Sequence, residues 1–557
     1  MFPSETPLQN LAHARGVIIS GGPHSVYDDS SPTLEREVLM AGIPVLGICY
    51  GHHLISQLLG GSVEKGDKGE FGLAILDLTG KNRSQLLNGV SDRQQIWMSH
   101  RDVVTSLPAG FDVLATTSTC DTAVIEDTAR RIYGVQFHPE VVHTTQGTRI
   151  LENFVFGICG CAKDWNPGQR IALVEAQIRQ CVGDRNVFFF VSGGVDSTVA
   201  FTLCLRALGP ARVRGVYVDT GLMREGETEF VERTFAQLGA GVVEIARCEA
   251  EFLGPLELVR DPELKRHVIG EQFVRVQERI IESRGLLDGH WILGQGTIYP
   301  DTIESGGTTK SATIKTHHNR VPGIQKLMEA GRIVEPLADF YKDEVRAIGH
   351  QLDLPAELLH RHPFPGPGLA IRCLCSEVEE PVTRVPEGWL IPVRSVGVQG
   401  DSRSYAPVLA IEALRQDEAT ELVNRTAGLN QSFNRVIARV ATREPLEHQR
   451  VFPSSITHGR VELLRRADAI VRDLCHTSGF EGKVWQFPVI LIPLGAGESR
   501  DSVVLRPIQS VDGMTADSVA MPDELLRDMS ARLMSIPEIA GIYYDLTHKP
   551  PGTIEWE

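Results

Sequence analysis

Phe188-Phe189-Phe190-Val191 leads directly into Ser192-Gly193-Gly194-Val195-Asp196-Ser197-Thr198, and Val199-Ala200-Phe201 follows. The apolar run before the glycines predicts a buried parallel strand, and the run after them predicts the start of a helix. Two adjacent glycines allow a sharp turn and leave no Cβ atom between the backbone amides and an approaching group. The stretch therefore predicts an α/β fold in which a glycine turn joins a strand to a helix.

The polar residues of this turn indicate a phosphate site. Ser192, Ser197 and Thr198 supply hydroxyl donors, and the free N–H groups of a helix start add partial positive charge. The carboxylate of Asp196 would repel a phosphate unless a cation lay between them, so Asp196 predicts bound Mg²⁺. A plain glycine turn is the alternative, but it leaves Asp196 unexplained. The Gly-Lys-Ser/Thr ending of a Walker loop is absent, and the stretch resembles the pyrophosphate loop of N-type ATP pyrophosphatases.

The length and net charge of the chain limit the number of domains and the kinds of partner that it could have. A chain of 557 residues is expected to hold about three domains. The formal net charge of −16 argues against nonspecific binding to nucleic acid or to a membrane surface. No apolar run approaches the length of a membrane span, and ten scattered cysteines do not suggest a disulfide framework. We therefore expect a cytoplasmic protein of the cytosol.

The order of patterns along the chain predicts three domains. Short apolar runs alternate with helical stretches over residues 1–160 and again over residues 170–362, which favours two parallel-sheet α/β domains. A proline- and glycine-rich connector at residues 361–368 then leads into a mixed α+β domain over residues 363–557. The clearest expected strands besides the opening one are Val17–Ser20, Val45–Ile48, Ile132–Phe137, Gly215–Asp219 and Trp291–Gly294.

The last domain contains a weak internal sequence repeat. Gly400-Asp401-Ser402-Arg403 with Val408–Ile411 recurs as Gly497-Glu498-Ser499-Arg500 with Val504–Ile508, and an Ile-Pro pair precedes each copy and is expected to start a strand. The match is short, so chance is an alternative. We prefer a duplicated subdomain that enlarges the C-terminal domain.

A second set of residues indicates cysteine chemistry. Cys49 lies at a tight turn between an apolar strand and a helical run, which is the arrangement of a nucleophile elbow. His138 and Glu140 follow another predicted strand and supply a base and the group that orients it. The backbone amides of Gly22 and Tyr50 could stabilise an oxyanion. A lone cysteine at such a turn is more often part of the core, and the histidine and glutamate change that balance.

These motifs in this order resemble class I glutamine amidotransferase domains, which release ammonia from glutamine. The resemblance implies that Cys49, His138 and Glu140 form the catalytic triad. The chain departs from the family in having His53 where a glutamine contacts the substrate, and Arg101 where a glycine follows His100. Met1 also directly precedes Phe2-Pro3-Ser4-Glu5-Thr6, a segment that a strand and a helix precede in the family. We expect this domain to lack that first strand and helix.

Further residues after the phosphate turn are candidates for ATP binding. Asp219 ends a predicted strand at the edge where adenosine contacts are common, and Gly294 opens a glycine-rich segment that ends at Asp301. Lys342 either contacts phosphate or lies on a solvated helix surface, and we favour phosphate because triphosphate charge needs cations in so acidic a protein. Lys315, His317 and His318 lie in a polar, unperiodic stretch expected to act as a mobile lid over ATP.

The whole arrangement resembles the family of GMP synthases, down to the ending Lys549-Pro550-Pro551-Gly552-Thr553-Ile554-Glu555-Trp556-Glu557. The resemblance implies that ATP adenylylates xanthosine 5′-monophosphate (XMP) and that ammonia from glutamine then displaces AMP to give GMP. It implies Mg²⁺ as cofactor and a homodimer formed through the C-terminal domain. It also implies an XMP site made by Arg266, Asp401, Gln486, Lys549 and Glu555.

Three other readings stay open on the sequence. One is another ATP-pyrophosphatase amide-forming enzyme, similar to NAD or asparagine synthetases. A second is a nucleotide-binding protein that keeps the fold without catalysis, and a third is a synthetase that uses free ammonium because its glutaminase half is impaired. The complete phosphate turn and the Cys49, His138 and Glu140 set favour the main interpretation.

Overall fold

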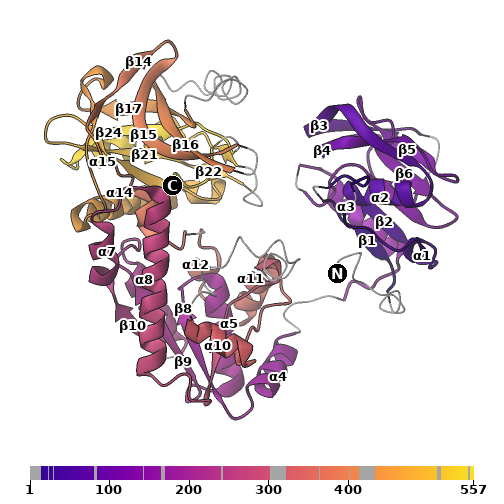
Figure 1. The fold of residues 1–557 in the computed structure, drawn as a ribbon, viewed down its shortest axis with the longest axis horizontal. Helices are drawn as coiled ribbons and strands as arrows, with labels where there is room; N and C mark the ends of the chain where they lie inside the picture. The colour runs from indigo at the N-terminus through magenta and orange to yellow at the C-terminus, as the bar shows by residue number, and fades with distance from the viewer. Residues whose placement is uncertain are drawn as a thin grey trace. The chain divides into compact units, whose positions relative to one another are not determined.

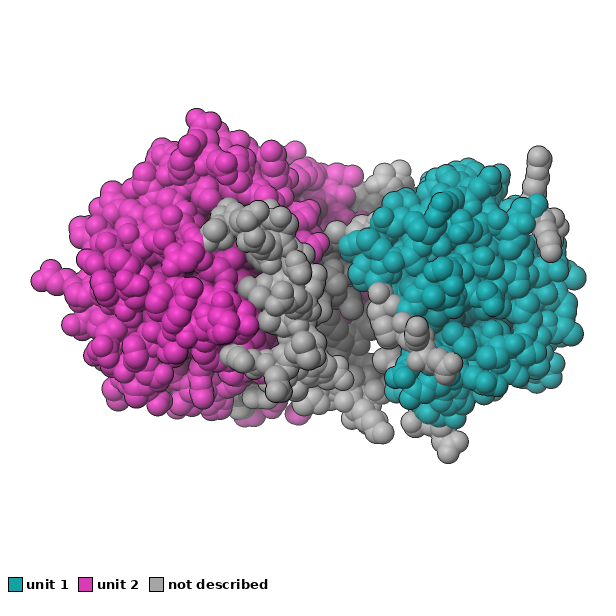
Figure 2. Space-filling model, turned by 90° about the horizontal axis from the view of Figure 1, so that it is seen from above, with its two compact units in different colours: residues 1–165 teal, residues 166–557 magenta. Residues whose placement is uncertain are grey.

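The computed structural model describes residues 14–22, 24–28, 31–80, 84–141, 143–164, 170–239, 243–301, 322–362, 364–399, 402–412, 433–510, 516–549 and 552–557. The chain divides into two compact units, residues 1–165 and residues 166–557 (Figure 2). The boundary between the units lies between the two α/β domains expected over residues 1–160 and 170–362. The division into three domains stays a prediction. Among the described residues, no helix is both long and apolar enough to cross a bilayer.

Unit 1 is built on a seven-stranded sheet with the order β1-β2-β7-β6-β5-β3-β4 (Figure 1). Strands β1, β2 and β7 are parallel, and the strands beyond β7 continue antiparallel. The strands are β1 (Val17–Ile19), β2 (Val45–Ile48), β3 (Ser62–Leu78), β4 (Arg93–Ser106), β5 (Asp112–Thr116), β6 (Val124–Asp127) and β7 (Ile132–Val135). The helices are α1 (Arg36–Leu39), α2 (Tyr50–Leu58) and α3 (Gly147–Glu152), and a π-helical turn, Asn153–Ile158, continues α3.

Alternating side chains of β2 bury both faces of this sheet. Val45 joins the apolar cluster that includes Leu54 of α2 and Val38 of α1. Leu46, the next residue, joins the cluster on the other face, which includes Ile150 of α3. This period of two is the strand pattern that placed Val45–Ile48 in the sheet on sequence alone.

Unit 2 begins with a fully parallel sheet of order β10-β9-β8-β11-β12. The order reverses beside β8, so the loops after β8 and β11 meet at the carboxyl edge, where ligands bind in such folds. The strands are β8 (Asn186–Val191), β9 (Val213–Asp219), β10 (Val243–Arg247), β11 (Trp291–Gly294) and β12 (Ile333–Val334). The helices are α4 (Ile171–Val182), α5 (Val195–Leu208), α6 (Glu227–Gln237), α7 (Glu249–Leu256), α8 (Pro262–Ser283), α10 (Pro322–Glu329), α11 (Lys342–Gln351) and α12 (Ala356–Leu359).

The rest of unit 2 carries a second seven-stranded sheet of order β14-β15-β16-β17-β24-β21-β19. Its strands are β14 (Thr383–Val385), β15 (Gly388–Gln399), β16 (Ser402–Ile411), β17 (Arg435–Thr442), β19 (Val489–Ile492), β21 (Asp501–Leu505) and β24 (Ile539–Asp545). Small pairings accompany it: β13 (Glu380–Pro381), β18 (Arg450–Val451), β20 (Leu494–Gly495), β22 (Ile508–Gln509) and β23 (Asp517–Ser518). The helices are α14 (His458–Thr477) and α15 (Asp523–Met534).

The two copies of the weak sequence repeat occupy matching places in this sheet. The hairpin β15-β16 continues into a parallel strand, β17, and the hairpin β19-β21 continues into a parallel strand, β24. Strands β17 and β24 run antiparallel at the centre, so the two halves face each other across that pair. The Ile-Pro pairs do not start strands as expected: Ile391 lies inside β15 where the register shifts, and Ile492 ends β19. Proline lacks the N–H that a ladder needs, which accounts for both interruptions.

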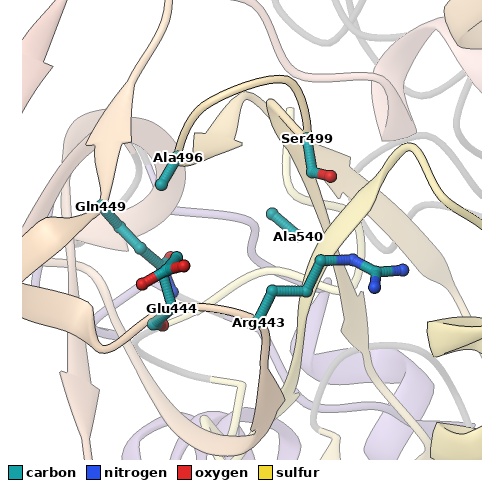
Figure 3. A pocket seen from close by; sticks show the side chains of 6 residues that line it. All are labelled: Arg443, Glu444, Gln449, Ala496, Ser499 and Ala540. Atoms are coloured by element: carbon teal, nitrogen blue, oxygen red, sulfur yellow. The ribbon is translucent and has the colours of Figure 1, made fainter.

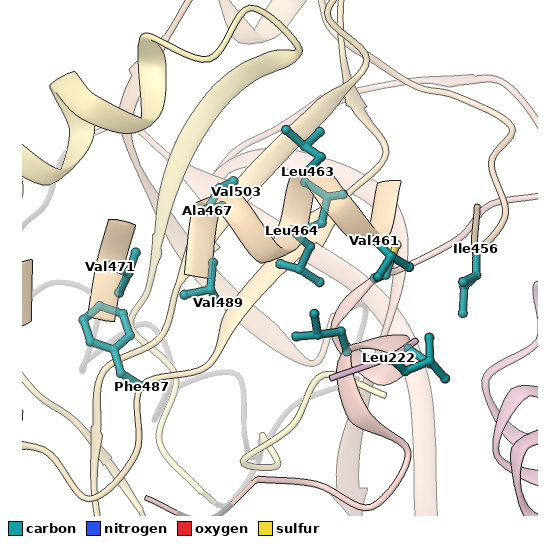
Figure 4. Packing of buried hydrophobic residues seen from close by; sticks show 14 of the residues in the cluster. Leu222, Ile456, Val461, Leu463, Leu464, Ala467, Val471, Phe487, Val489 and Val503 are labelled. Carbon is teal, nitrogen blue, oxygen red and sulfur yellow. The ribbon is translucent and has the colours of Figure 1, made fainter. Parts of the chain in front are cut away.

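One apolar cluster joins the parallel sheet to the C-terminal part of unit 2. It contains Phe188 of β8 and Leu222, which follows β9, together with Val461 and Leu464 of α14 and Val489 of β19. Figure 4 shows side chains of α14, such as Leu464, near Val489 of β19 and near Leu222. Because burying one such side chain stabilises the fold by about 1.5–3 kcal/mol, this shared core accounts for residues 166–557 forming a single compact unit.

A buried ion cluster fixes the centre of the second sheet. Arg435 of β17 and Arg506 both place a guanidinium nitrogen near Asp545 Oδ2, at 3.0 Å and 2.7 Å, and all three side chains are fully buried. Trp556 Nε1 donates to the same oxygen at 2.8 Å. Burial raises the pKa of Asp545, but the two arginines outweigh that effect and the net pKa is lowered. The carboxylate is therefore held ionised inside the protein.

Candidate active sites

The first candidate site is a nucleophile elbow in unit 1. Cys49 lies between the end of β2 and the first residue of α2, with φ 50 and ψ −103. Only two other described non-glycine residues have a positive φ, and this conformation costs of the order of 1–2 kcal/mol. Tight packing holds the turn in place, since a Cβ atom on Gly51 would lie 2.1 Å from the carbonyl oxygen of Ile19. The strain presents the sulfur at the carboxyl edge of the sheet.

His138 and Glu140 complete a triad beside this cysteine. His138 follows β7, the neighbour of β2, and its Nδ1 lies 2.6 Å from Glu140 Oε1. Burial by itself lowers the pKa of His138, but hydrogen bonding and charge interaction with Cys49 and Glu140 raise that pKa to about 10. The imidazole therefore carries a proton at neutral pH, lies beside the Cys49 sulfur on one side, and is oriented by a carboxylate on the other.

The two expected oxyanion donors lie next to each other. A Cβ atom on Gly22 would come within 3.8 Å of the Tyr50 side chain, so the Gly22 backbone runs past the start of α2. Tyr50 is the first residue of α2, and N–H groups in a first turn have no partner within their helix. The Tyr50 hydroxyl donates to the Pro32 carbonyl oxygen, which fixes the side chain away from the amide. The amides of Gly22 and Tyr50 therefore stay the candidates for oxyanion donors.

Other groups that the sequence did not single out surround the sulfur. Cys49 Sγ lies 3.7 Å from the carbonyl oxygen of Ser99 and 3.9 Å from Gln136 Nε2. Gln136 Oε1 in turn lies 2.7 Å from Nε2 of His53. Gln136 immediately precedes Phe137 and His138, and its place two residues before the base was the only signal in the sequence. Arg101, the other departure from the amidotransferase pattern, is an exposed residue of β4.

The second candidate site is the turn between β8 and α5. Gly193 has φ 71, and a Cβ atom there would lie 2.5 Å from Val231 Cγ2. Both the backbone conformation and the lack of space therefore require glycine at this position. Ser192 Oγ and Ser197 Oγ lie 2.9 Å apart, and the Gly194 amide donates to Ser192 Oγ at 3.2 Å. Thr198 Oγ1 donates back to the Gly194 carbonyl oxygen at 2.8 Å. These hydrogen bonds hold Ser192–Thr198 in the compact loop expected of a phosphate cradle.

Asp196 is the candidate metal ligand of this loop. Its Oδ2 lies 2.5 Å from Nζ of Lys342, the first residue of α11. Its Oδ1 is buried and has no hydrogen-bond partner. A carboxylate oxygen left open beside a phosphate cradle fits Mg²⁺, which takes one or two carboxylates together with substrate phosphates. Among the described residues, no group of three or more acidic, histidine or cysteine side chains could hold a metal without such a substrate.

The segment after one other strand contacts this loop, and the residue at the end of another strand shapes the neighbouring turn. A Cβ atom on Gly296, two residues after β11, would lie 2.8 Å from Ser197 Cα, so the glycine-rich segment after Gly294 packs directly on the loop. Asp219 ends β9, and its two oxygens accept from the Gly221 amide and from Thr228 Oγ1, both at 3.0 Å. The carboxylate of Asp219 therefore shapes the turn that leads out of β9.

Arg361 is a residue of this site that sequence reasoning missed. Its guanidinium donates to the carbonyl oxygen of Gly193 at 3.3 Å and to Glu227 Oε2, and lies 4.6 Å from the ring centroid of Phe230. It thereby ties the phosphate loop to α6. Its place in a proline-rich connector, far along the chain from the loop, left no local signal.

The C-terminal residues gather a cluster of charges that includes three of the expected XMP ligands. Arg372 forms a two-pronged ion pair with Glu555, at 2.9 Å and 2.7 Å, and Gln486 Nε2 lies 3.3 Å from Glu555 Oε1. Burial raises the pKa of Glu555, but Arg372 and the nearby Arg224 and Arg266 lower it overall. Arg224 also lies 3.4 Å from Asp468, so the cluster brings together groups of both signs. Its arginines are candidates for binding a nucleotide phosphate.

The neighbouring residues extend this cluster. Arg266 donates to the backbone oxygen of Glu557, and Lys265, which is fully buried, lies 2.6 Å from the Glu557 carboxylate. Lys549 is part of the segment that pairs through its backbone with Ala516. Lys265, Arg224 and Arg372 were not singled out in the sequence, because isolated arginines and lysines there look like surface charges.

Four expected site residues lie outside the described residues. They are the lid residues Lys315, His317 and His318, and the XMP candidate Asp401. The expectation of a missing first strand concerns the start of the chain, and residues 1–13 are likewise outside the described ranges.

A small hollow in the second sheet of unit 2 is lined by Arg443, Glu444, Gln449, Ala496, Ser499 and Ala540 (Figure 3). Arg443 donates to the carbonyl oxygens of Ile539, Met534 and Ile536. The amide of Gln449 donates to the Glu444 backbone and accepts from Tyr543. The polar groups of Arg443 and Gln449 therefore serve the fold.

The fold and the two sites define a class of protein: a cysteine amidotransferase unit joined to an ATP-dependent synthetase unit. Residues 1–158 match the family Glutamine amidotransferase class-I, and residues 473–556 match the family GMP synthase C terminal domain.

Relatives that match the chain over nearly its full length identify the family within this class. The chain is 41% identical to a protein of Leptospira interrogans named "Probable GMP synthase [glutamine-hydrolyzing]", over 100% of this chain and 95% of that protein. It is 37% identical to the "GMP synthase [glutamine-hydrolyzing]" of Streptomyces coelicolor, covering 100% and 93%, and 37% identical to that of Geobacillus kaustophilus, covering 98% and 91%. The chain belongs to the family of glutamine-hydrolysing GMP synthases.

Proposed function

We propose that this chain converts XMP to GMP, a step of purine biosynthesis, with ATP as the activating substrate and glutamine as the source of ammonia. The observation that carries the proposal is that one chain assembles both halves of the chemistry. Cys49 and His138 face each other in unit 1, and the Ser192–Thr198 loop is closed around its own hydrogen bonds in unit 2.

In the first half-reaction the Cys49 sulfur attacks the side-chain amide carbon of glutamine. The amides of Gly22 and Tyr50 stabilise the oxyanion, and His138 gives its proton to the departing ammonia. The raised pKa of His138 suits this role, because the ring then holds the proton when it is needed. Water, activated by the neutral imidazole that remains, hydrolyses the glutamyl thioester and returns Cys49 and glutamate.

In the second half-reaction the C2 oxygen of XMP attacks the α-phosphorus of ATP and pyrophosphate leaves. The leaving phosphates bind to the hydroxyls of Ser192 and Ser197 and to the first amides of α5. Lys342 contacts Asp196 and so places its positive charge beside the same loop. Mg²⁺ held by Asp196 would neutralise charge on the pyrophosphate. Ammonia then adds to the activated purine carbon and AMP departs, which gives GMP.

The C-terminal charge cluster is the proposed XMP site. Arg266 and Arg372 supply positive charge for the phosphate, and Gln486 and Glu555 offer polar groups to the purine ring. Asp401 and Lys549 are proposed to complete this site, and Lys315, His317 and His318 to close over ATP. A cytosolic homodimer paired through the C-terminal region completes the proposal, and sedimentation analysis would test the dimer.

The test follows GMP formation from XMP and ATP with glutamine and, separately, with ammonium. Activity with both nitrogen sources supports the proposal. Activity with ammonium alone would indicate an impaired glutaminase half, for which His53 and Arg101 are the specific grounds. No activity with either source would favour the nucleotide-binding alternative, and product formation from a different acceptor would favour another amide-forming synthetase.

A further inference from the structure

We propose that His53 is a positioning residue of the glutaminase site, which fixes the Gln136 side chain so that the Gln136 amide N–H group points at the Cys49 sulfur. The proposal rests on the glutaminase function proposed above. It gives a role to the residue that departs from the amidotransferase pattern.

The three residues form a short chain of contacts. His53 Nε2 lies 2.7 Å from Gln136 Oε1, and Gln136 Nε2 lies 3.9 Å from Cys49 Sγ. His53 is 4% exposed and Gln136 is fully buried. His53 belongs to the first turn of α2, where its amide donates to the Cys49 carbonyl oxygen, and Gln136 directly follows β7. Both partners are therefore set on rigid elements on either side of the nucleophile.

The hydrogen-bonding role of His53 Nε2 decides which way the amide of Gln136 points. Burial lowers the pKa of His53 to about 4, and His100 adds to this, while the hydrogen bond to Gln136 opposes it. The ring is therefore neutral near pH 7 and carries a single N–H. A proton on Nε2 makes that atom a donor, and Gln136 Oε1 is the acceptor it faces. The NH₂ end of Gln136 is then directed at the sulfur.

The opposite orientation is unfavourable for a working nucleophile. It would place the oxygen of Gln136 beside the thiolate, where two negative centres repel each other. The observed orientation instead adds an N–H donor to the charged form of the sulfur, and a hydrogen bond to a charged group is stronger than one between neutral groups. His53 thus acts on Cys49 through Gln136 and need not touch the substrate.

Several titratable groups surround this chain and bear on its pH dependence. His138, with Glu140 behind it, faces the sulfur from the end of β7. His52 and His100 lie beside the His53 ring, with centroid distances of 5.7 Å and 6.4 Å. Asp102 also acts on His53. The pKa of His52 is lowered well below its ordinary value by burial, with His53 and His100 adding to this, so His52 is neutral as well. None of these groups replaces the amide donor of Gln136.

The test uses the full-length protein and the alkylation of Cys49 by iodoacetamide between pH 5 and pH 10, followed by mass spectrometry. His53→Leu keeps much of the volume and removes the donor, so we expect the midpoint of alkylation to move about one pH unit higher and glutamine kcat/KM to fall about tenfold. His53→Gln retains an N–H donor and should restore both values to within about threefold. Gln136→Leu should match His53→Leu, and the double variant should add nothing further.

The outcomes separate this proposal from the proposed function. An unchanged alkylation midpoint in His53→Leu overturns the positioning role even if glutamine hydrolysis slows. A wild-type protein that hydrolyses no glutamine contradicts the proposed function, while the midpoint shift would still support the contact chain. His448→Ala, an exposed histidine of unit 2, is the matched control and should change neither readout. Failure of His53→Gln to recover the midpoint would also count against the proposal.

Discussion

The two turns proposed to carry the chemistry share one design and differ in which residue adopts a positive φ. Both follow a parallel strand, and both lead straight into a helix: β2 into α2 at Cys49, and β8 into α5 at Ser192–Thr198. Each needs a residue in the left-handed region. In unit 1 that residue is Cys49 itself, with φ 50, whereas in unit 2 it is Gly193, with φ 71.

The difference follows from what each turn delivers. The elbow is proposed to present a single side chain, so the residue in the strained conformation is the proposed nucleophile, and packing must hold the strain. The phosphate loop presents backbone amides and hydroxyls, so the strained position is best filled by a residue with no side chain. The strained position is therefore occupied by cysteine in the turn that is proposed to react through a side chain, and by glycine in the turn that is proposed to bind through its backbone.

The largest expected effect removes the elbow's side chain. Cys49→Ala should lower glutamine-supported GMP formation by about 10⁴-fold or more, since no other group can form the thioester. Ammonium-supported formation should stay within about twofold of wild type, because the phosphate loop is untouched. Steady-state assays with each nitrogen source measure both. Equal loss with ammonium would mean that the two turns do not work independently.

The second effect adds a side chain where the loop has none. Gly193→Ala brings a Cβ atom to within 2.5 Å of Val231 and into a disfavoured φ, so we expect about a 10²-fold loss with both nitrogen sources. Gly183→Ala has a similar φ of 58 but nothing within 4 Å of the added atom, and it is the matched control. The comparison between the turns would fail if Gly193→Ala impaired only the glutamine reaction.

A third, smaller effect distinguishes two adjacent glycines near the elbow. A Cβ atom on Gly21 would lie 3.0 Å from His138 Cε1, whereas one on Gly22 would meet Tyr50 only at 3.8 Å. Gly21→Ala should therefore displace the base and lower glutamine kcat/KM by about 10–100-fold, and Gly22→Ala by about threefold or less. The reverse ranking would contradict the assigned position of His138.

A fourth effect concerns pH. The folded pKa of His138, about 10, lies above the ordinary value of 6.5, so its interactions add stability that is fully present below about pH 6.5 and lost as the pH rises to 10. Glu140→Gln removes one cause of the raised pKa. We expect the Tm advantage of wild type over Glu140→Gln to shrink over that window, and the alkaline limb of glutaminase activity to move to lower pH in the variant. Differential scanning calorimetry and pH–rate profiles measure these changes, and parallel Tm curves would refute the assignment.

The smallest effect isolates the strain at the elbow. Cys49→Gly and Cys49→Ala both lack the sulfur, but only glycine adopts φ 50 without steric cost. The glycine variant should be the more stable of the two by about 1 kcal/mol in unit 1, measured by calorimetry. A glycine variant that is no more stable than the alanine one would show that the elbow stores no strain.

Local pattern was enough to predict the parallel strands and the two turns. Val45–Ile48 and Trp291–Gly294 form strands with the bounds expected. The expected strand Ile132–Phe137 extends two residues beyond the end of β7, and the expected strand Gly215–Asp219 begins two residues after the start of β9. The fold class of α/β units followed by a mixed α+β region is confirmed. The first sheet is parallel only at β1, β2 and β7. Local sequence pattern does not distinguish an antiparallel pair such as β3-β4 from a crossover between parallel strands.

Long-range contacts could not be predicted in the same way. Arg361 lies on the phosphate loop from a connector 168 residues away, and Gln136 reaches Cys49 from 87 residues away. The sequence around Arg361 and around Gln136 does not indicate which distant residue each of them contacts. Lys342 was expected near phosphate, and its contact with Asp196 shows how a lysine from α11 reaches the loop once the sheet is formed.

The carboxylate of Asp545 has a consequence for the order in which the chain can be built. A polypeptide that grows from its N-terminus makes Arg435 and Arg506 before Asp545 exists, and β17 lacks its central neighbour β24 until then. Two buried cations without a counter-charge are strongly unfavourable. The second sheet should thus close late and in a single step during synthesis, after the parallel sheet around β8 already has all of its strands. Until that moment the exposed edge of β17 is the point at which a nascent chain most needs protection from aggregation.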